Sequence, residues 1–492
     1  MAKFTKIIAS LIGVSALWLG GTAYISSNTK SYLNTYIAKS SSLYNANGMQ
    51  MHVENFEKGF FSSNAKIKID FVDPTLRETI SETFKLPIEL DYKIENGPLF
   101  FKNGLSLGSS RISSTVNLSS YLVDQEAFKK IFKEDIELTS MTSIDFFNNA
   151  SFTAKTNKIL ANVDGDEVQV SPLTIEGDMN IETFQGQMKM LVDSVLAENK
   201  TEFIKARNIV LDADIKKFYD NGFYLGNFVL SLGSLDMKDE LLPFELNGAK
   251  GTFTMDVEEN KNKTIDMKFN LHAKLGDSKL PKEYSSLNEV ELSYALNGTK
   301  LEGLLAFQDF TTGLQVKQQE IMRRLKSSTT GEIDMKVLAE LEKVQTENME
   351  RMMVLMAGLL HKDSSNLNIE MKMIDKKEKS SHLEMNLAYV GDEVLPTTAK
   401  ALEEKFRKEF LNLVNIELDV ELEKDYIANL PLEFQQELAG QLQVGAMFGV
   451  VQENNSSFSF DASYQAKRLM LNGKDRSEML QLLEQGLLAE GI

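Results

Sequence analysis

A serine in a glycine-rich string is the clearest candidate for covalent chemistry in this chain of 492 residues. The string Gly104-Leu105-Ser106-Leu107-Gly108 matches the G-x-S-x-G motif, in which a sharp turn between a strand and a helix exposes a nucleophilic serine. Residues 109–116, which follow the motif, are typical of a loop or a strand and not of a helix. We therefore predict no catalytic residue here, and a hydrolase that uses Ser106 is the weakest of three functional hypotheses.

The four histidines are the next candidates, because a neutral imidazole is a common metal ligand. His52, His272, His361 and His382 are far apart in the sequence, and none belongs to an H-E-x-x-H motif. Known sites space their ligands much more closely. We expect solvated histidines, and we predict no metal ion, no cofactor and no cofactor-binding residue.

Two acidic segments could suggest cation binding. Asp164-Gly165-Asp166-Glu167 lacks the twelve-residue ligand pattern of a calcium loop and lies between alternating apolar segments, so we predict a hairpin turn. The acidic residues between Glu417 and Glu423 alternate with apolar ones, which is typical of a sheet face exposed to solvent.

The charge balance excludes one class of partner. Lys and Arg total 53 against 71 Asp and Glu, a formal net charge of −18. Nucleic-acid binding depends on neutralising phosphates, so we predict no nucleic-acid partner. The same charge argues against broad adhesion to anionic lipid surfaces. The chain has no cysteine, which excludes disulfides, thiol nucleophiles and Cys-ligated zinc.

Most of this chain is predicted to form β-strands, so any site there must be positioned by strands. Residues 264–275 alternate strictly between apolar and polar side chains, which predicts a strand with one dry and one wet face. The same alternation recurs at residues 290–296, 367–373, 383–389 and 416–423, and strands at short spacing favour antiparallel pairing. Asn-Gly pairs tolerate the positive φ of tight turns, and they predict hairpins at Asn96, Asn103, Asn221, Asn247, Asn297 and Asn472.

A helical pattern interrupts the strands at residues 313–361. Its apolar side chains fall mostly on one face and include Met349, Met352, Met353 and Met356. Flexible thioethers fill irregular cores and also line apolar grooves, and core filling is the default. Further helical patterns occupy residues 398–414, 432–451 and 476–488. The predicted fold class is α+β: a predominantly antiparallel β-sheet body with a few long amphipathic helices.

The N-terminal segment predicts export. Residues 7–25 contain no charged side chain and, as a helix, would be about 28 Å long, close to the thickness of a bilayer's hydrocarbon core. Lys3 and Lys6 precede the segment and would keep the N-terminus in the cytoplasm. The alternative is a cleavable signal peptide, with a cleavage site near residues 21–23. In either case the remainder of the chain lies outside the cytoplasm.

We therefore divide the chain into four segments. Residues 1–25 form an N-terminal signal-anchor transmembrane helix, and residues 26–300 a β-rich periplasmic region. Residues 301–362 form a helical segment, and residues 363–492 a second β-rich region with C-terminal helices.

Several short motifs resemble the YdgA-like family of bacterial inner-membrane proteins, whose function is unknown. The strongest is Phe56-Glu57-Lys58-Gly59-Phe60-Phe61-Ser62-Ser63-Asn64-Ala65, and Ile94-Glu95-Asn96-Gly97-Pro98 resembles the family's I-x-x-G-P turn. Trp18 with Gly20-Gly21 and Leu471-Asn472-Gly473-Lys474 are also similar, so the matches bracket nearly the whole chain. The family usually carries His where Asn96 stands. The resemblance implies an uncleaved inner-membrane anchor and a periplasmic body, and it supplies no catalytic residue.

Three functional hypotheses remain open. The first is a non-enzymatic, membrane-anchored envelope protein with a structural or interaction role. It allows for self-association, because Ala9, Gly13, Ala16 and Gly20 place small residues on one helical face. The second is a protein that binds or transfers lipid or another hydrophobic ligand along a sheet, and the third is the hydrolase. The sequence does not identify a protein partner.

Overall fold

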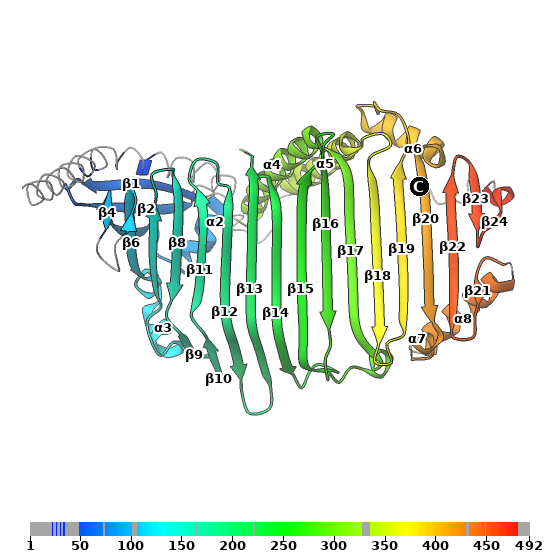
Figure 1. Ribbon diagram of the computed structural model, residues 1–492, viewed down its shortest axis with the longest axis horizontal. Helices are drawn as coiled ribbons and strands as arrows, with labels where there is room; N and C mark the ends of the chain where they lie inside the picture. Colours follow the sequence, from blue (N-terminus) through cyan, green and yellow to red (C-terminus); the bar gives the residue numbers. More distant parts are fainter. Residues whose placement is uncertain are drawn as a thin grey trace, which may run out of the picture. The chain divides into compact units, whose positions relative to one another are not determined.

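The structure is a computed structural model, shown in Figure 1. It describes Thr22, Ser26, Lys30, Leu33 and Asn34 near the N-terminus, and then residues 49–71, 74–100, 106–163, 165–219, 222–326, 335–429, 432–447 and 449–480. The chain forms two compact units. The first contains Met1–Asn199 and Asn208–Tyr224, and the second contains Lys200–Arg207 and Leu225–Ile492. The division therefore falls inside strand β13 (Phe203–Phe218).

The first unit is built around an antiparallel sheet. Its strands are β1 (Met49–Glu57), β2 (Ser62–Phe71), β3 (Ile88–Asn96), β6 (Ser110–Asn117), β7 (Glu137–Ile144), β8 (Asn149–Thr156), β11 (Leu173–Asn180), β12 (Gly186–Glu198), β10 (Asp166–Val170) and β9 (Ile159–Val163), given in the order in which they pair. The short strands β4 (Leu99–Phe100) and β5 (Ser106–Leu107) pair with each other. The helices are α2 (Pro74–Ser81), α3 (Gln125–Ile131) and the 3-10 turn η1 (Leu118–Tyr121).

The core of this unit lies against β1, β2 and β3. Ala65, Ile67 and Ile94 are buried there, and Leu33, which has helical backbone geometry, packs against them. Alternation along β2 places Ala65 and Ile67 on the same side of the sheet, which is why one face of the strand is dry.

The second unit contains an antiparallel sheet in which nearly all strands pair with their neighbours in sequence (Figure 1). Its strands are β14 (Tyr224–Lys238), β15 (Glu245–Glu259), β16 (Thr264–Lys274), β17 (Leu287–Lys300), β18 (Asn366–Asp375), β19 (Ser380–Tyr389), β20 (Val414–Glu423), β22 (Ser457–Gln465), β23 (Arg468–Leu471) and β24 (Lys474–Asp475), and β21 (Gln452–Glu453) pairs with β22. Among the described residues, the predicted strand at 264–275 is confirmed as β16, and the other predicted strands are confirmed as β17, β18, β19 and β20.

Helices interrupt this sheet in the sequence. Helices α4 (Leu301–Lys326) and α5 (Met335–Leu359) connect β17 to β18 and lie side by side (Figure 1). The others are α6 (Ala399–Leu413), α7 (Lys424–Asn429), α8 (Leu432–Met447) and the 3-10 turns η2 (Lys282–Tyr284) and η3 (Ser477–Met479). The prediction of a predominantly antiparallel sheet with a few helices is confirmed for the described part of the chain.

The Met-rich stripe of α5 is not a filled core at three of its positions. Met349 is 67% exposed, Met353 38% and Met356 54%. They are spaced by four and three residues, so they share one face of the helix. Core filling was the expected role, and it is wrong for these three side chains.

The Asn-Gly pairs differ in role more than the sequence suggested. Asn472-Gly473 forms the predicted tight turn between β23 and β24. Asn247-Gly248 and Asn297-Gly298 instead lie inside β15 and β17, where the strand register shifts. Gly248 and Gly298 have φ values of 69° and 66°, and a β-bulge requires the same left-handed backbone as a hairpin turn. Asn103 and Asn221 lie outside the described residues.

The predicted transmembrane segment, residues 7–25, lies outside the described residues except for Thr22. Within the described part of the chain, none of the helices combines the length and the apolar character that crossing a bilayer requires.

Candidate functional site

One face of the second unit's sheet carries continuous rows of apolar side chains. Each row runs across the strands, because the antiparallel registers bring apolar residues into direct opposition. The central row contains Leu230, Phe253, Leu271, Leu292, Met371, Leu383, Val420 and Phe460, from β14 to β22. A parallel row, two residues along each strand, contains Phe228, Met255, Phe269, Tyr294, Ile369, Met385, Leu418 and Ala462.

This apolar face is partly open to solvent. Five side chains of the central row are between 36% and 43% exposed, namely Leu230, Leu271, Leu292, Met371 and Leu383, and Tyr294 in the parallel row is 38% exposed. Seven strand spacings separate the ends of the central row, which makes it roughly 33 Å long. Apolar residues scattered singly on a surface need no explanation, whereas a contiguous apolar patch marks an interaction site.

Other elements cover one end of the face. Leu413 and Phe406 of α6 pack with Leu387 and Ile416 next to the buried Tyr389. Phe460 and Ala462 of β22 pack with residues that follow α8, among them Val450 and Met479. The exposed stretch of the central row therefore runs from Leu230 on β14 to Leu383 on β19. We call these five residues, Leu230, Leu271, Leu292, Met371 and Leu383, the open apolar row.

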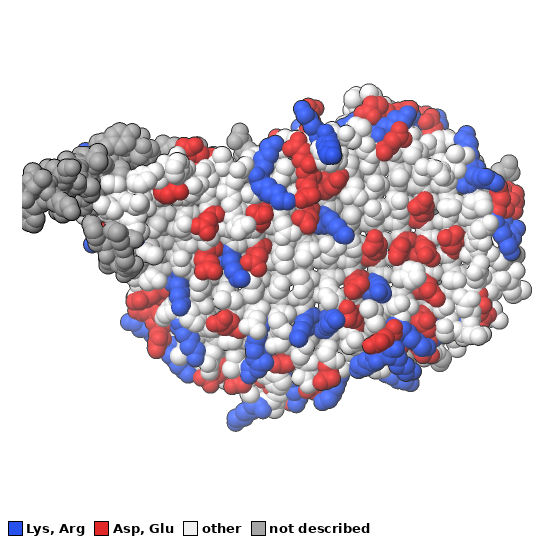
Figure 2. Space-filling view, in the orientation of Figure 1, with Lys and Arg blue, Asp and Glu red and all other residues white. Residues whose placement is uncertain are grey.

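The opposite face of the same strands is polar and partly acidic. Glu370, Glu384, Asp419 and Asp461 are direct cross-strand neighbours on β18, β19, β20 and β22. Figure 2 shows acidic side chains gathered over these strands. Because like charges in direct opposition destabilise a sheet, this row does not stabilise the fold. The charged side chains of this row make this face of the sheet hydrophilic, whereas the other face is apolar. The predicted solvated acidic face is confirmed at Glu417 and Asp419, which are exposed, whereas the side chain of Glu423 is only 12% exposed and lies 3.4 Å from Lys379.

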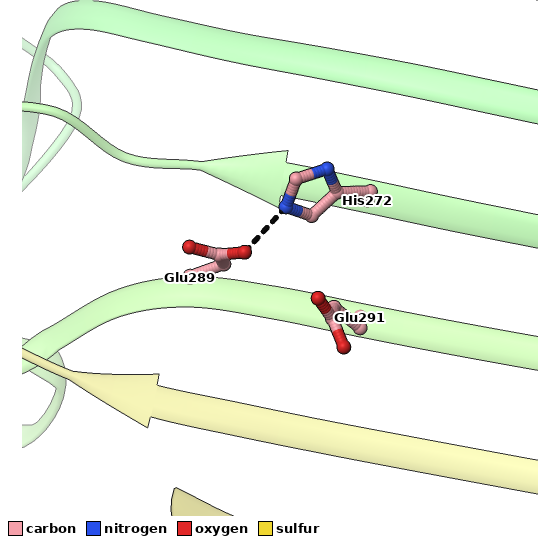
Figure 3. A group of neighbouring side chains, drawn as sticks. All are labelled: His272, Glu289 and Glu291. Carbon is pink, nitrogen blue, oxygen red and sulfur yellow. Dashed lines mark hydrogen bonds and ion pairs between the residues drawn. The ribbon is translucent and has the colours of Figure 1, made fainter. Parts of the chain in front are cut away.

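A histidine and two glutamates meet on the polar face, and the sequence patterns did not indicate this group. His272 on β16 points toward Glu289 on β17, and Glu291 lies beside them (Figure 3). His272 Nε2 is 2.5 Å from Glu289 Oε1, and Lys274 Nζ is 3.1 Å from Glu289 Oε2. Burial of the Glu289 carboxyl raises its pKa, but the hydrogen bonds with His272 and Lys274 outweigh burial, so the pKa of Glu289 lies below its ordinary value.

These three side chains could each offer one ligand atom to a cation, since the atoms lie within 4.8 Å of one another. Imidazole and carboxylate groups are the ligand types of zinc sites. Here, however, Lys274 and His272 already occupy both oxygens of Glu289. A metal ion bound by His272 and Oε1 of Glu289 would have to replace their direct contact, next to the ammonium of Lys274 on the other oxygen, so the geometry favours an ion-pair network. The signal in the sequence was weak: His272 and Glu289 are 17 residues apart, and only the strand register joins them.

The candidate nucleophile Ser106 lies in the short strand β5, followed by strand β6. The expected lack of a helix after the motif is therefore confirmed. The Ser106 hydroxyl accepts a hydrogen bond of 2.7 Å from Nη2 of Arg111, whose guanidinium lies 4.8 Å from the centre of the Phe100 ring. A guanidinium is always protonated, so it cannot take a proton from the serine. Gly104 lies outside the described residues.

The remaining candidates lie in separate strands and turns of the described residues. Strands β9 and β10 pair across residues 164–165, as the predicted hairpin requires, although Asp164 itself lies outside the described residues. His382 lies 3.6 Å from Asp419 on the acidic row. His361 Nδ1 contacts the Lys362 carbonyl at 2.9 Å. His52 lies on β1 opposite Lys68.

The model of a family described as "Bacterial protein of unknown function (DUF945)" matches residues 1–479. Neither a curated protein nor a solved structure matched the chain.

Proposed function

The chain belongs to this bacterial family, whose function is unknown, and we propose that the protein binds the hydrocarbon chains of lipids along the open apolar row of its second unit. The observation that carries the proposal is the alignment of five partly exposed apolar side chains on β14 and β16 to β19, with the less exposed Phe253 of β15 between the first two.

A lipid suits this surface for a physical reason. The row offers apolar contact along its length, with no charged side chain in the row itself. Burying about ten methylene groups of an acyl chain against it would contribute about 8 kcal/mol before the cost of association. The polar face of the same strands provides no comparable surface, so binding is directed to one side of the sheet.

We further propose that residues 7–25 hold the protein in a bacterial inner membrane, with its N-terminus in the cytoplasm and its body in the periplasm. The charge-free segment, the preceding Lys3 and Lys6 and the resemblance to YdgA-like proteins support this. The proposed role is non-enzymatic. The experiment below measures lipid content and does not depend on this topology.

Lipid analysis of the full chain tests the binding proposal. The protein is purified in mild detergent and washed, and its lipids are extracted and measured by mass spectrometry. We expect lipid in a fixed ratio to protein, lost in the double variant Leu271→Gln with Leu292→Gln. The control is Leu241→Gln, because Leu241 is 89% exposed and lies in the turn between β14 and β15.

Wild-type protein that retains no lipid would contradict the proposal. Covalent dimers formed by crosslinking, lost in the same double variant and free of lipid, would instead assign the row to a second copy of the chain. Thermal unfolding of each variant confirms that loss of lipid does not reflect loss of the fold.

A further inference from the structure

Large apolar side chains also gather at one edge of the first unit's sheet. Phe60 and Phe61, in the turn between β1 and β2, are 44% and 53% exposed. Phe146 and Phe147, in the turn between β7 and β8, are 51% and 79% exposed, and Leu107 of β5 is 70% exposed. We call these five residues the phenylalanine edge.

The strand registers place these residues at the same edge of the sheet. Glu95, at the end of β3, pairs with Ser62 at the start of β2. The next residue of β3 pairs with Ser110 at the start of β6, and Ser110 pairs with Ile144 at the end of β7. The turns at 58–61 and 145–148 therefore lie at corresponding ends of neighbouring strands. Leu107 is three residues before Ser110.

Internal hydrogen bonds fix both turns. The buried Asn96 side chain donates to the carbonyl oxygens of Gly59 and Phe60 at 3.1 and 3.2 Å. The carboxylate of Asp145 accepts from the backbone N–H groups of Phe147 and Asn149 at 2.7 and 2.8 Å. A polar side chain thus holds the backbone of each turn, while the phenyl rings remain exposed.

The N-terminal segment reaches this edge. The Ser26 hydroxyl donates a hydrogen bond of 2.7 Å to the carbonyl of Gly59, and Ser26 is only 2% exposed. Ser26 directly follows residues 7–25, which contain no charged side chain. Wherever those residues enter a bilayer, the turn that carries Phe60 and Phe61 is held next to the point where the chain leaves it.

We propose that the phenylalanine edge inserts into the interfacial layer of the bilayer that holds residues 7–25. Phe and Leu side chains bury favourably at the boundary between the headgroups and the acyl chains. The attachment depends on apolar contact, so it is compatible with the net charge of −18. The inference rests on the proposed membrane anchor and is independent of lipid binding by the second unit.

Tryptophan fluorescence in membranes tests this inference on the full chain. Trp18 is the single tryptophan, so Trp18→Phe gives a silent background. Into it we place Phe147→Trp, and in a second variant Phe61→Trp, in case the first does not fold. The control is Val123→Trp, because Val123 is 49% exposed and lies beyond the other end of β6. Each protein is reconstituted into vesicles with and without lipids brominated on their acyl chains.

We expect brominated lipid to quench the Phe147→Trp and Phe61→Trp proteins strongly, with blue-shifted emission, and to leave the Val123→Trp protein unquenched. If Trp18 of the unaltered chain is quenched while Phe147→Trp and Phe61→Trp behave like the control, the anchor stands and the inference is overturned. If Trp18 is not quenched either, the membrane anchor itself fails, and the inference fails with it.

Discussion

Leu271 and Leu292 stand directly opposite each other on β16 and β17, and they are 43% and 40% exposed. In the adjacent cross-strand pair, His272 and Glu291 oppose each other on the other face. A single step along the strands therefore separates an apolar surface from a charged one. This alternation supports lipid binding to one face only.

The open apolar row should contribute more to binding than to stability. We expect Leu292→Ala to cost about 1–2 kcal/mol of unfolding free energy, below the roughly 2–5 kcal/mol typical of a buried leucine. It should also weaken binding of a fluorescent apolar dye such as N-phenylnaphthylamine. The matched comparison is Leu402→Ala, because Leu402 is fully buried on α6. Leu402→Ala should lose roughly 2–5 kcal/mol of unfolding free energy. Under conditions in which it is folded, it should bind the dye as tightly as the wild type does. Equal effects of both variants on dye binding would argue against a binding surface.

The acidic row should lower stability in a salt-dependent manner. Glu384 lies between Glu370 and Asp419, both in direct register. We expect Glu384→Gln to raise the unfolding free energy by about 0.2–1 kcal/mol, measured by urea denaturation at low salt. Added salt should reduce the gain, because the charges are exposed and screened. Glu403→Gln on α6, outside the row, is the control. A gain that persists at high salt would exclude charge repulsion as its cause.

The sequence predicted the strands and which side chains share a face, because alternation depends only on side chains within one strand. It also predicted a dry face for the apolar side chains of β16, and this is wrong at Leu271, which is 43% exposed. It could not show that Leu271 aligns with Leu292, Met371 and Leu383, since register is set by turns and bulges elsewhere. The open apolar row could therefore not be predicted from sequence patterns.

The same limit explains the missed side-chain group and the misread turns. Glu289 approaches His272 only because β16 and β17 pair in one particular register. Asn297-Gly298 has the local preferences of a hairpin turn, yet β17 continues through it as a bulge. A positive φ is common to both structures, so the dipeptide cannot distinguish them.

The contribution of Glu289 to stability should depend on pH. Its pKa is lower in the folded chain than its ordinary value, so its stabilising effect is complete above about pH 4.3 and is lost as the pH falls through the folded-state pKa. We expect Glu289→Gln to cost about 1–3 kcal/mol at pH 7, where a charged hydrogen-bonding partner is lost. The difference in unfolding free energy between this variant and the wild type should shrink as the pH falls below about 4, near the ordinary pKa of glutamate. Urea denaturation at each pH measures this difference. Glu291→Gln on the same strand serves as the control, and a pH-independent loss in Glu289→Gln would refute the ion-pair interpretation.

A single introduced cysteine can test the proposed membrane topology. Because the chain contains no cysteine, Leu241→Cys places one reactive group at a position that is 89% exposed. We expect a membrane-impermeant maleimide to label it in intact spheroplasts. A cysteine placed next to Lys3, at Ala2, should be labelled only after the membrane is opened. Labelling of Ala2→Cys, but not Leu241→Cys, in intact spheroplasts would reverse the proposed orientation.

Asn96 should stabilise the turn that carries Phe60 and Phe61. Its side chain is buried and donates to the carbonyls of Gly59 and Phe60, so Asn96→Ala leaves both acceptors without this donor. We expect a loss of about 1–3 kcal/mol in unfolding free energy and faster amide exchange across residues 59–62. Asn55→Ala, at an exposed position of β1, should change neither quantity. Asn96→His should lose less than the alanine variant, because an imidazole N–H can still donate to one carbonyl. If Asn96→Ala left amide exchange at residues 59–62 unchanged, the strands alone would hold the turn. The Asn96 hydrogen bonds would then not be what keeps Phe60 and Phe61 exposed.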